Sequence, residues 1–301
     1  MTNVDRAQSR AECGSIGAVQ VIPSGGPLGA EIRGVDLSKP IDAATREIVI
    51  DAFHRHLAIY FRDQELSDQD LVAATALFGE PMADDRTYGF DKTYDYDRSI
   101  DTEYPELIDI VSNVTKDGKP IGALGSGEAV WHSDTQPIPN SALVLYALEV
   151  PETGGDTRLL NCYRAYEALP QELKKRIWNR ILIHCRTSNL IRGQEPDFDR
   201  DFSNLPGPWF PLVRTHGDTR RQTLFLGRQG EGHIVGLTPE ESNALLRDLW
   251  EHAVRPEFVW AHRWKQGDLL VWDNRCTLHS RSDFQGRRRM HRTTARGEWP
   301  Q

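Results

Sequence analysis

The sequence lacks any uninterrupted apolar run close to the roughly 18 residues that a membrane-spanning helix needs. The segment 1–17 is polar and has no apolar centre of the kind that marks a signal peptide. Internal repeats, heptad patterns and low-complexity blocks are also absent. We therefore expect a flexible tail over 1–17, a single domain over 18–301, and no membrane partner.

Cysteine is scarce, and positive charge is in the minority. The four cysteines (Cys13, Cys162, Cys185 and Cys276) lack metal-type spacing, so we interpret them as reduced thiols of a cytoplasmic protein. The net charge is −8, and the one basic run is 287–289. A nucleic-acid-binding protein carries a basic surface, so no nucleic-acid partner is expected.

The hydrophobic fraction of 39% allows a substantial core, and its periodicity predicts a mainly β domain with flanking helices. Strands are expected at 57–61, 108–111, 141–150, 222–226, 258–264 and 268–272. Helices are expected at 43–56, 67–78, 163–168, 171–179 and from Thr238 onward. Predicted buried faces contain Ile48, Val49, Ala52, Phe53 and His56 in the first helix and Leu245, Leu246, Leu249, Trp250 and Ala253 in the last. Segments 81–107, 114–127 and 192–211 read as loops, and the first and last are expected to cover a pocket.

The most informative stretch is Trp131-His132-Ser133-Asp134-Thr135. On an extended strand, residues two apart project from the same face, so His132 and Asp134 could meet one metal ion. A strand-end histidine paired with a nearby acid is the simpler alternative. The third ligand that we favour is His279, which follows a Trp-Asp-Asn-Arg turn. Other histidines compete for this role, namely His184, His216, His233 and His262. Two histidines and one carboxylate on one face of the ion form the facial triad of non-haem Fe(II) oxygenases.

A basic stretch, 287–292, follows His279 by a few residues. Such a run is usually a solvated patch. Strand alternation allows a second interpretation, in which Arg288, Met290 and Arg292 share one face and Arg287, Arg289 and His291 the other. Two guanidinium groups turned into a pocket could each hold a carboxylate.

The chain resembles the taurine/2,4-D dioxygenase family of Fe(II)- and 2-oxoglutarate-dependent oxygenases. The matching pieces keep their order along nearly the whole chain after the tail. They are 27–37, Phe78-Gly79-Glu80, Trp131-His132-Ser133-Asp134, Gly154-Gly155-Asp156-Thr157, Trp272-Asp273-Asn274-Arg275 through His279, and Arg288 with Met290-His291-Arg292.

The resemblance implies a double-stranded β-helix (jelly-roll) core and Fe(II) held by His132, Asp134 and His279. It implies that Thr157 and Arg288 hold the distal carboxylate of 2-oxoglutarate, and that Arg292 lies near the primary substrate and meets its acidic group. With O2, such an enzyme hydroxylates a small organic substrate, in some cases with cleavage of a carbon–heteroatom bond, and releases succinate and CO2. A carboxylate at 134 favours oxygenation over halogenation. Homodimers or homotetramers are common in this family.

Two positions depart from the taurine-oxidising member. Asp84 stands where that member has a histidine for the sulfonate, and Glu128 stands where it has an asparagine. Acids at both positions would repel a sulfonate, which argues against taurine as the substrate. We expect a substrate whose acidic group faces Arg292 and whose amine or hydroxyl faces Asp84 or Glu128.

A different class of protein could also carry a His-Asp-His set. A non-oxidative jelly roll could use it as a Zn(II) hydrolase or as a small-molecule binder. Thr157, Arg288 and Arg292 distinguish the two, because neither alternative needs a clamp for 2-oxoglutarate.

Overall fold

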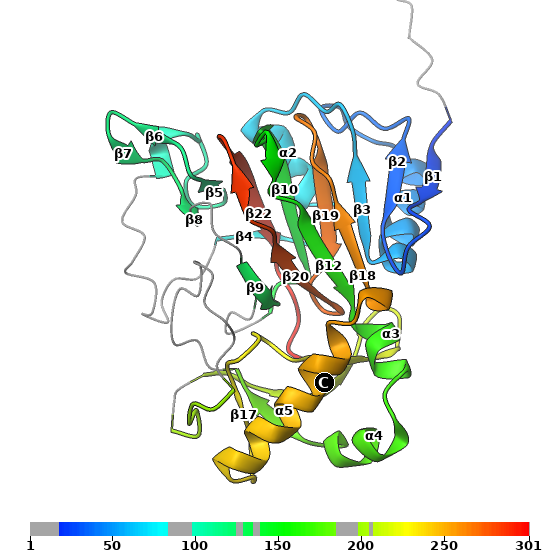
Figure 1. Ribbon diagram of the computed structural model, residues 1–301. Coiled ribbons are helices and arrows are strands. Elements are labelled where there is room, and N and C mark those ends of the chain that lie inside the picture. Colours follow the sequence, from blue (N-terminus) through cyan, green and yellow to red (C-terminus); the bar gives the residue numbers. More distant parts are fainter. Residues whose placement is uncertain are drawn as a thin grey trace, which may run out of the picture.

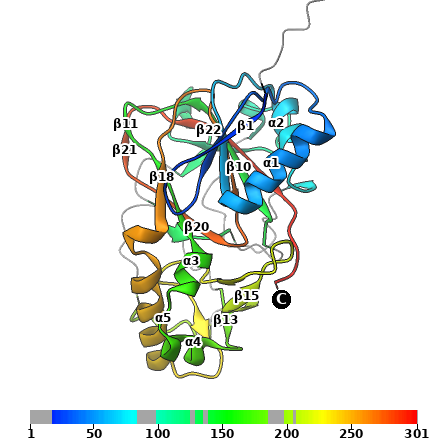
Figure 2. The same cartoon turned by 90° about the vertical axis from the view of Figure 1, so that its right-hand side faces the viewer.

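The computed structural model describes residues 18–83, 98–124, 129–134, 139–184, 198–204 and 207–300. Its core is built from two facing β-sheets, with helices on the outer side of each (Figures 1 and 2). This arrangement confirms the mainly β, jelly-roll fold expected from the sequence. In the described ranges, no helix is long and apolar enough to cross a membrane.

The larger sheet has nine strands in the order β1-β2-β3-β19-β10-β22-β5-β8, with β4 paired to β22. Its strands are β1 (Gln20–Pro23), β2 (Ala30–Arg33), β3 (Ala58–Phe61), β4 (Pro81–Met82), β5 (Asp109–Ser112), β8 (Ala123–Leu124), β10 (Ala142–Glu149), β19 (Leu269–Asp273) and β22 (Arg289–Ala295). The apolar run of β10 is buried between two antiparallel neighbours, β19 and β22, and forms the centre of the sheet.

The smaller sheet has four strands in the order β18-β12-β20-β9. Its strands are β18 (Val259–His262), β12 (Thr157–Asn161), β20 (Thr277–Arg281) and β9 (Ala129–His132). Leu159 of β12 packs against Leu143, Leu145 and Trp272 of the larger sheet, so it lies on the inner face. Its neighbour Leu160 packs on the outer side with the helices, as strand alternation requires.

Helices α1 (Ala43–His56) and α2 (Asp68–Thr75) cover the outer face of the larger sheet, where Val49, Phe53 and Leu71 join its core. Ser67 begins α2 with a capping box to Asp70. This helix is shorter than predicted, because residues 76–78 leave the helix in turns.

Helix α5 (Pro239–Ala253) packs on the outer face of the smaller sheet with α3 (Cys162–Glu167) and α4 (Gln171–Ile177). It begins with the predicted capping box between Thr238 and Glu241, and all five residues predicted for its buried face are buried. Shorter elements complete the chain: β6 (Thr115–Lys116), β7 (Lys119–Pro120), β11 (Thr153–Gly154), β13 (Ile181–Ile183), β14 (Trp209–Pro211), β15 (Val213–Thr215), β16 (Gln222–Leu224), β17 (His233–Ile234), β21 (Phe284–Gln285), and the 3-10 turns η2 (Arg98–Ile100) and η3 (Pro256–Phe258).

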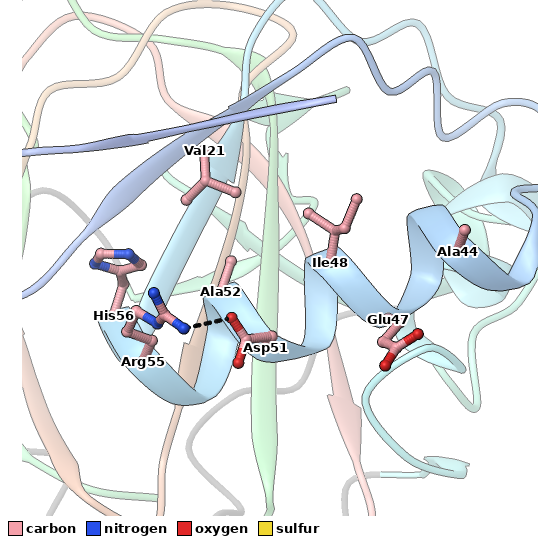
Figure 3. A pocket seen from close by; sticks show the side chains of 8 residues that line it. All are labelled: Val21, Ala44, Glu47, Ile48, Asp51, Ala52, Arg55 and His56. Carbon is pink, nitrogen blue, oxygen red and sulfur yellow. Dashed lines mark ion pairs between the residues drawn. The ribbon is translucent and has the colours of Figure 1, made fainter. Parts of the chain in front are cut away.

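Several local predictions were wrong. The segments 81–107 and 192–211, predicted as loops, contain the short strands β4 and β14, and His56, assigned to the buried face of α1, is only partly buried. The segment 114–127 is not a plain loop, because it contains the β6–β7 hairpin and β8. Ile48 was assigned to the buried face of α1 but is 40% exposed. It lies in a shallow groove beside Val21 of β1, at the edge of the sheet (Figure 3). The apolar face of α1 is therefore narrower than its periodicity suggests.

Candidate active site

A metal-type cluster lies where β9 and β20 run side by side. His132 and His279 are paired in the ladder between these strands, and their ring centroids are 4.0 Å apart. Asp134 follows the end of β9, and its Oδ1 lies 3.7 Å from His132 Nε2. Ligand atoms of the three residues all lie within 4.8 Å of one another. The sequence-predicted triad is therefore brought together, although Asp134 stands just beyond the strand rather than on it.

The protonation of the cluster suits a metal. Burial, the neighbouring His279 and the charge of Arg228 lower the pKa of His132 well below its ordinary value. Burial also lowers the pKa of His279 to about 4, against the opposing effect of Asp134. Both imidazoles are therefore neutral at pH 7, which is the form that binds metals. His132 Nδ1 lies 2.8 Å from the Val130 carbonyl, so a proton there leaves the lone pair of Nε2 facing Asp134.

The side chain of Asp134 is held in one orientation by Arg292 of β22. Arg292 Nη1 donates to Asp134 Oδ2 at 2.9 Å, and Nη2 donates to Asp109 Oδ2 at 2.8 Å. The other oxygen, Asp134 Oδ1, is the one near His132. The guanidinium of Arg292 therefore interacts with two carboxylates and directs one oxygen of Asp134 to the cluster.

The backbone of Asp134 is held by Asn274, which is completely buried. Asn274 Oδ1 accepts from the Asp134 amide at 3.0 Å, and Nδ2 donates to the Asp134 carbonyl at 2.8 Å and to the Asn140 carbonyl at 3.2 Å. The amide side chain thus replaces the strand pairing that ends at His132. Its three hydrogen bonds place the carboxylate at a fixed point beside the two imidazoles.

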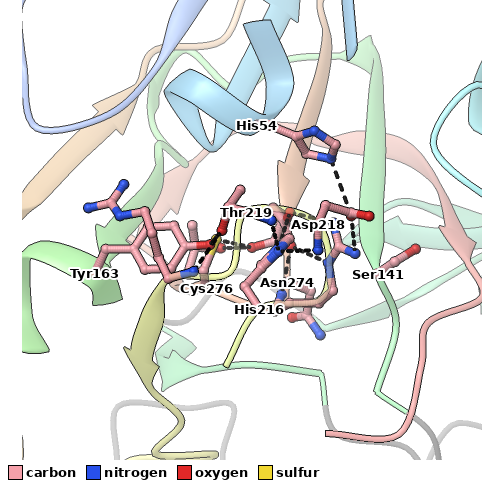
Figure 4. A network of polar contacts seen from close by, with 12 residues as sticks. His54, Ser141, Tyr163, His216, Asp218, Thr219, Asn274 and Cys276 are labelled. Carbon is pink, nitrogen blue, oxygen red and sulfur yellow. Dashed lines mark hydrogen bonds and ion pairs between the residues drawn. The ribbon is translucent and has the colours of Figure 1, made fainter. Parts of the chain in front are cut away.

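A buried polar network lies next to Asn274 (Figure 4). Asp273 accepts from Arg275 at 2.7 Å and is 2.9 Å from His216 Nε2. His216 and Asp273 form, with Cys276, a second cluster of potential metal ligands. The Asp273 carboxylate is already bound by a guanidinium and an imidazole, and Arg275 helps to hold its pKa well below the ordinary value. We therefore interpret this cluster as structural support for the turn that carries Asn274.

A group of buried cationic residues lies further along β20, on the same inner faces. Thr157 is paired with Arg281 across β12 and β20, two positions from the pairing of Leu159 with His279. Arg288 is buried, and its Nε and Nη1 have no hydrogen-bond partner among the described residues. Burial and the nearby Arg281 lower the pKa of Arg288 to about 9. A buried guanidinium in this state needs an anion, because an uncompensated buried charge is costly.

The hydroxyl of Thr157 can donate a hydrogen bond to such an anion. Trp264 Nε1 donates to Thr157 Oγ1 at 3.1 Å, which leaves the hydroxyl hydrogen to be donated in turn. Thr157 is buried, as are Arg281 and Arg288. Two guanidinium groups and one hydroxyl therefore lie together near the end of β20, two residues beyond His279. This chemistry fits a carboxylate.

The sequence predicted some of this site and missed other parts. Asp84 and Glu128 lie outside the described residues, so their proposed contacts stay predictions. The competing histidines are elsewhere: His216 on Asp273, His262 on Asp268, His184 between aromatic rings, and His233 in β17. The described cysteines, Cys162 and Cys276, are buried free thiols, as expected.

Four residues that contact or adjoin the candidate site were not identified from the sequence: Asp109, Arg228, Asn274 and Arg281. Arg281 could have been found, because it is two residues from His279 and so shares its face. Asn274 stands within the Trp-Asp-Asn-Arg motif, but its bonds to Asp134 span 140 residues. Only the folded sheet brings such partners together.

Comparison with known proteins agrees with this geometry. Residues 20–294 match the family model "Taurine catabolism dioxygenase TauD, TfdA family". The chain is 34% identical to the alpha-ketoglutarate-dependent 2,4-dichlorophenoxyacetate dioxygenase of Cupriavidus pinatubonensis, over 88% of this chain and 93% of the relative. It is 32% identical to the alpha-ketoglutarate-dependent sulfate ester dioxygenase of Pseudomonas putida, over 94% and 91%.

Solved structures give the same result. AAD-2 in complex with Mn(II) and N-oxalylglycine has a TM-score of 0.74 and 29% identity, covering 94% of this chain and 98% of that one. A taurine dioxygenase from Burkholderia xenovorans has a TM-score of 0.72 and 30% identity, covering 94% and 90%. The chain therefore belongs to the taurine/2,4-D (TauD/TfdA) dioxygenase family.

Proposed function

We propose that His132, Asp134 and His279 hold the Fe(II) of a 2-oxoglutarate-dependent dioxygenase, and that Thr157 and Arg288 hold the distal carboxylate of the cosubstrate. One observation carries this proposal. A cluster of two neutral imidazoles and a carboxylate lies on the inner face of β20, and the buried Arg288, near Arg281 of the same strand, has no anionic partner among the described residues. A Zn(II) hydrolase or a simple binder would have no use for this second feature.

The residues present fit both Fe(II) and 2-oxoglutarate. Two imidazole nitrogens and one carboxylate oxygen form the facial set that suits non-haem Fe(II) and leaves positions for other ligands. Strand geometry places Arg281 and Thr157 about 7 Å from His279 along the sheet, so a short dicarboxylate can span from the metal to the cations. When bound, Fe(II) with 2-oxoglutarate and O2 supplies the oxidation, releasing succinate and CO2.

The protein itself contributes positioning and electrostatics. Arg292 and Asn274 fix the carboxylate of Asp134, so the metal meets a preformed set of ligands. Arg288 and Thr157 fix the far end of the cosubstrate, and the buried pocket excludes water around it. Both contacts favour a dicarboxylate over a monocarboxylic keto acid, because the second carboxylate balances the charge of Arg288.

The primary substrate is, in this proposal, a small organic anion. The named relatives act on 2,4-dichlorophenoxyacetate, on sulfate esters and on (S)-phenoxypropionate, which are all acids. Oxidation at a carbon that bears oxygen gives an unstable hydroxylated product, whose collapse would cleave the carbon–oxygen bond. The predicted contacts of Asp84 and Glu128 argue against taurine, and the substrate contact of Arg292 stays a prediction.

The proposal is tested by anaerobic addition of Fe(II) and 2-oxoglutarate. A visible metal-to-ligand charge-transfer band should appear, and a screen of aryloxy acids, sulfate esters, sulfonates and N-substituted amino acids should then release succinate in air. The His279→Ala protein should lose the band, whereas the control variant His252→Ala, at a part-buried position on α5, should keep it. If wild type shows no band and no succinate with any compound, the non-oxidative alternative is favoured.

We also propose a cytoplasmic homodimer or homotetramer. The resemblance to the family supports the oligomer, and the scarcity of cysteine supports a reducing compartment. Light scattering of the purified protein checks the oligomeric state, and fractionation of the native host checks the cytoplasmic location.

A further inference from the structure

The segment 296–299, which we call the strap, follows β22 and runs down to β15 (Figure 2). Ser141 Oγ donates to the Arg296 carbonyl at 2.9 Å. Gly297 is packed so closely that a Cβ atom there would overlap the Pro139 carbonyl oxygen. The strap therefore lies directly on the stretch of chain that leads into β10.

The same stretch of chain also binds Asn274, the residue that holds the backbone of Asp134. The Asn274 amide donates to the Ser141 carbonyl at 3.1 Å, and Asn274 Nδ2 donates to the Asn140 carbonyl at 3.2 Å. Asn140 and Ser141 are both buried. A displacement of the strap would therefore be passed through these two residues to Asn274, and from Asn274 to the proposed metal ligand Asp134.

The far end of the strap faces a buried charge. Arg214 of β15 is 1% exposed, and none of its three guanidinium nitrogens has a hydrogen-bond partner among the residues that the structure describes. Burial lowers the pKa of Arg214, and the charges of Asp273 and Glu298 oppose that effect. Asp273 is already bound by Arg275 and His216. Glu298, whose Oε1 lies 3.7 Å from Arg214 Nη2, is therefore the acid that can balance this charge.

Two further contacts fix the end of the strap. Gly217 has no side chain, and a Cβ atom there would overlap the carboxylate of Glu298. The ring centroid of Trp299 lies 5.4 Å from that of the buried Phe210 of β14. The strap therefore joins β14 and β15 to the residues that support Asn274.

The strap contributes little to the hydrophobic core. The side chains of Arg296 and Glu298 are about half exposed, and Trp299 is 57% exposed. Because the strap buries little apolar surface, its contribution to the free energy of unfolding should be small. Its contacts are instead concentrated on the backbone next to Asn274 and on the charge of Arg214.

We propose that the strap is a positioning element for the metal ligand Asp134, and that Glu298 holds it in place through the buried charge of Arg214. This inference rests on the proposed function, in which Asp134 binds the metal. A strap displaced from Ser141 leaves Asn274 without a fixed partner. The carboxylate of Asp134 then meets the metal in a less defined position, which weakens metal binding.

The test is a Mn(II) titration of the full-length apoprotein followed by electron paramagnetic resonance. Gly297→Ala should weaken Mn(II) binding about 10-fold, because the added methyl group pushes the strap away from Pro139. Glu298→Gln, which removes the charge and keeps the size, should weaken it by a smaller factor. The dissociation constant of 2-oxoglutarate, measured by calorimetry at saturating Mn(II), should stay within about twofold of wild type, because Arg288 and Thr157 are untouched.

A double variant tests the path from the strap to the metal ligand. If the strap acts through Asn274, the protein that carries both Asn274→Ala and Gly297→Ala should bind Mn(II) no more weakly than Asn274→Ala alone. Trp209→Ala is the matched control, because Trp209 of β14 is as exposed as Trp299 but lies outside the strap. It should bind Mn(II) as tightly as wild type.

The outcomes separate this inference from the proposed function. If wild type binds no Mn(II), the proposed function fails, and this inference fails with it. If wild type binds Mn(II) and the Gly297→Ala and Glu298→Gln proteins bind it equally tightly, the strap has no positioning role. Additive losses in the double variant, or an equal loss in Trp209→Ala, overturn the inference as well. If Gly297→Ala does not fold, Glu298→Gln decides the question, alone and combined with Asn274→Ala.

Discussion

The side-chain amide of Asn274 provides a sharp test of how the metal ligands are positioned. Asn274→Ala removes an acceptor for the Asp134 amide and the donors for the Asp134 and Asn140 carbonyls. None of these groups is itself a metal ligand. The substitution therefore perturbs the position of a ligand without removing any ligand.

The size of the effect follows from the number of bonds. Three hydrogen bonds at about 1 kcal/mol each predict a loss of about 3 kcal/mol in the free energy of unfolding. Typical domains are stable by about 5–15 kcal/mol, so the variant should still fold. Removal of an outer-shell partner of a metal ligand usually weakens metal affinity about 10- to 100-fold. The Asn274→Ala protein should therefore show a loss of stability and a loss of metal affinity together.

Mn(II) titration followed by electron paramagnetic resonance measures the metal affinity, and urea denaturation measures stability. The control is Asn161→Ala, which removes the N-cap of α3 and a bond to the Pro27 carbonyl. It should cost about 2 kcal/mol of stability and leave the Mn(II) affinity unchanged. An Asn274→Ala protein that is destabilised yet binds Mn(II) as tightly as wild type would show that Asp134 is positioned by other contacts.

Three further predictions concern charge and ligands. Arg288→Gln should raise the dissociation constant of 2-oxoglutarate about 10- to 100-fold, because it removes the cation that holds the distal carboxylate. It should not lower the stability of the apoprotein, because it also removes an uncompensated buried charge. Unchanged 2-oxoglutarate binding in a direct titration would contradict this prediction. Fe(II) with 2-oxoglutarate at 100 times its dissociation constant should stabilise the fold by about 2.7 kcal/mol, measured by anaerobic thermal unfolding, and EDTA should abolish the gain. The third concerns His279, whose pKa falls from 6.5 to about 4 on folding. Above pH 6.5 both states are neutral; below it the unfolded state binds more protons, so apoprotein stability should fall by about 1.4 kcal/mol per pH unit between 6.5 and 4 from this residue. His279→Gln should flatten that slope in urea titrations.

Local sequence patterns predicted elements whose cause is local. The bounds of α1 and the capping box of α5 follow from Asp42, Thr238 and Glu241, which act within a few residues of their own positions. The alternation of side chains along β22 was also predicted from the sequence. Met290 faces the inner core, while His291 faces Asp68 of α2. These contacts confirm the strand from Arg289 onward, whereas Arg287 and Arg288 precede the strand and Arg287 is exposed.

Sheet membership could not be read from the chain. Segments 259–262 and 269–273 look like a hairpin joined by a turn at Gly267 (φ +79°). In the structure β18 belongs to the smaller sheet and β19 to the larger, so the turn carries the chain between the two layers. The partners of Arg292 could not be predicted for the same reason, because Asp109 comes from β5 and Asp134 from the residues that follow β9. Register across a sheet depends on partners far away in sequence.

The row of paired residues across β20, β9 and the segment 227–229 has a consequence for which positions beside the cluster tolerate substitution. Backbone hydrogen bonds fix the distance between position 228 and His132. The chemical character of the side chain at 228 can therefore vary while every metal ligand stays in place. The spacing between this position and His132 is set by the main chain, so it does not depend on which side chain stands at 228.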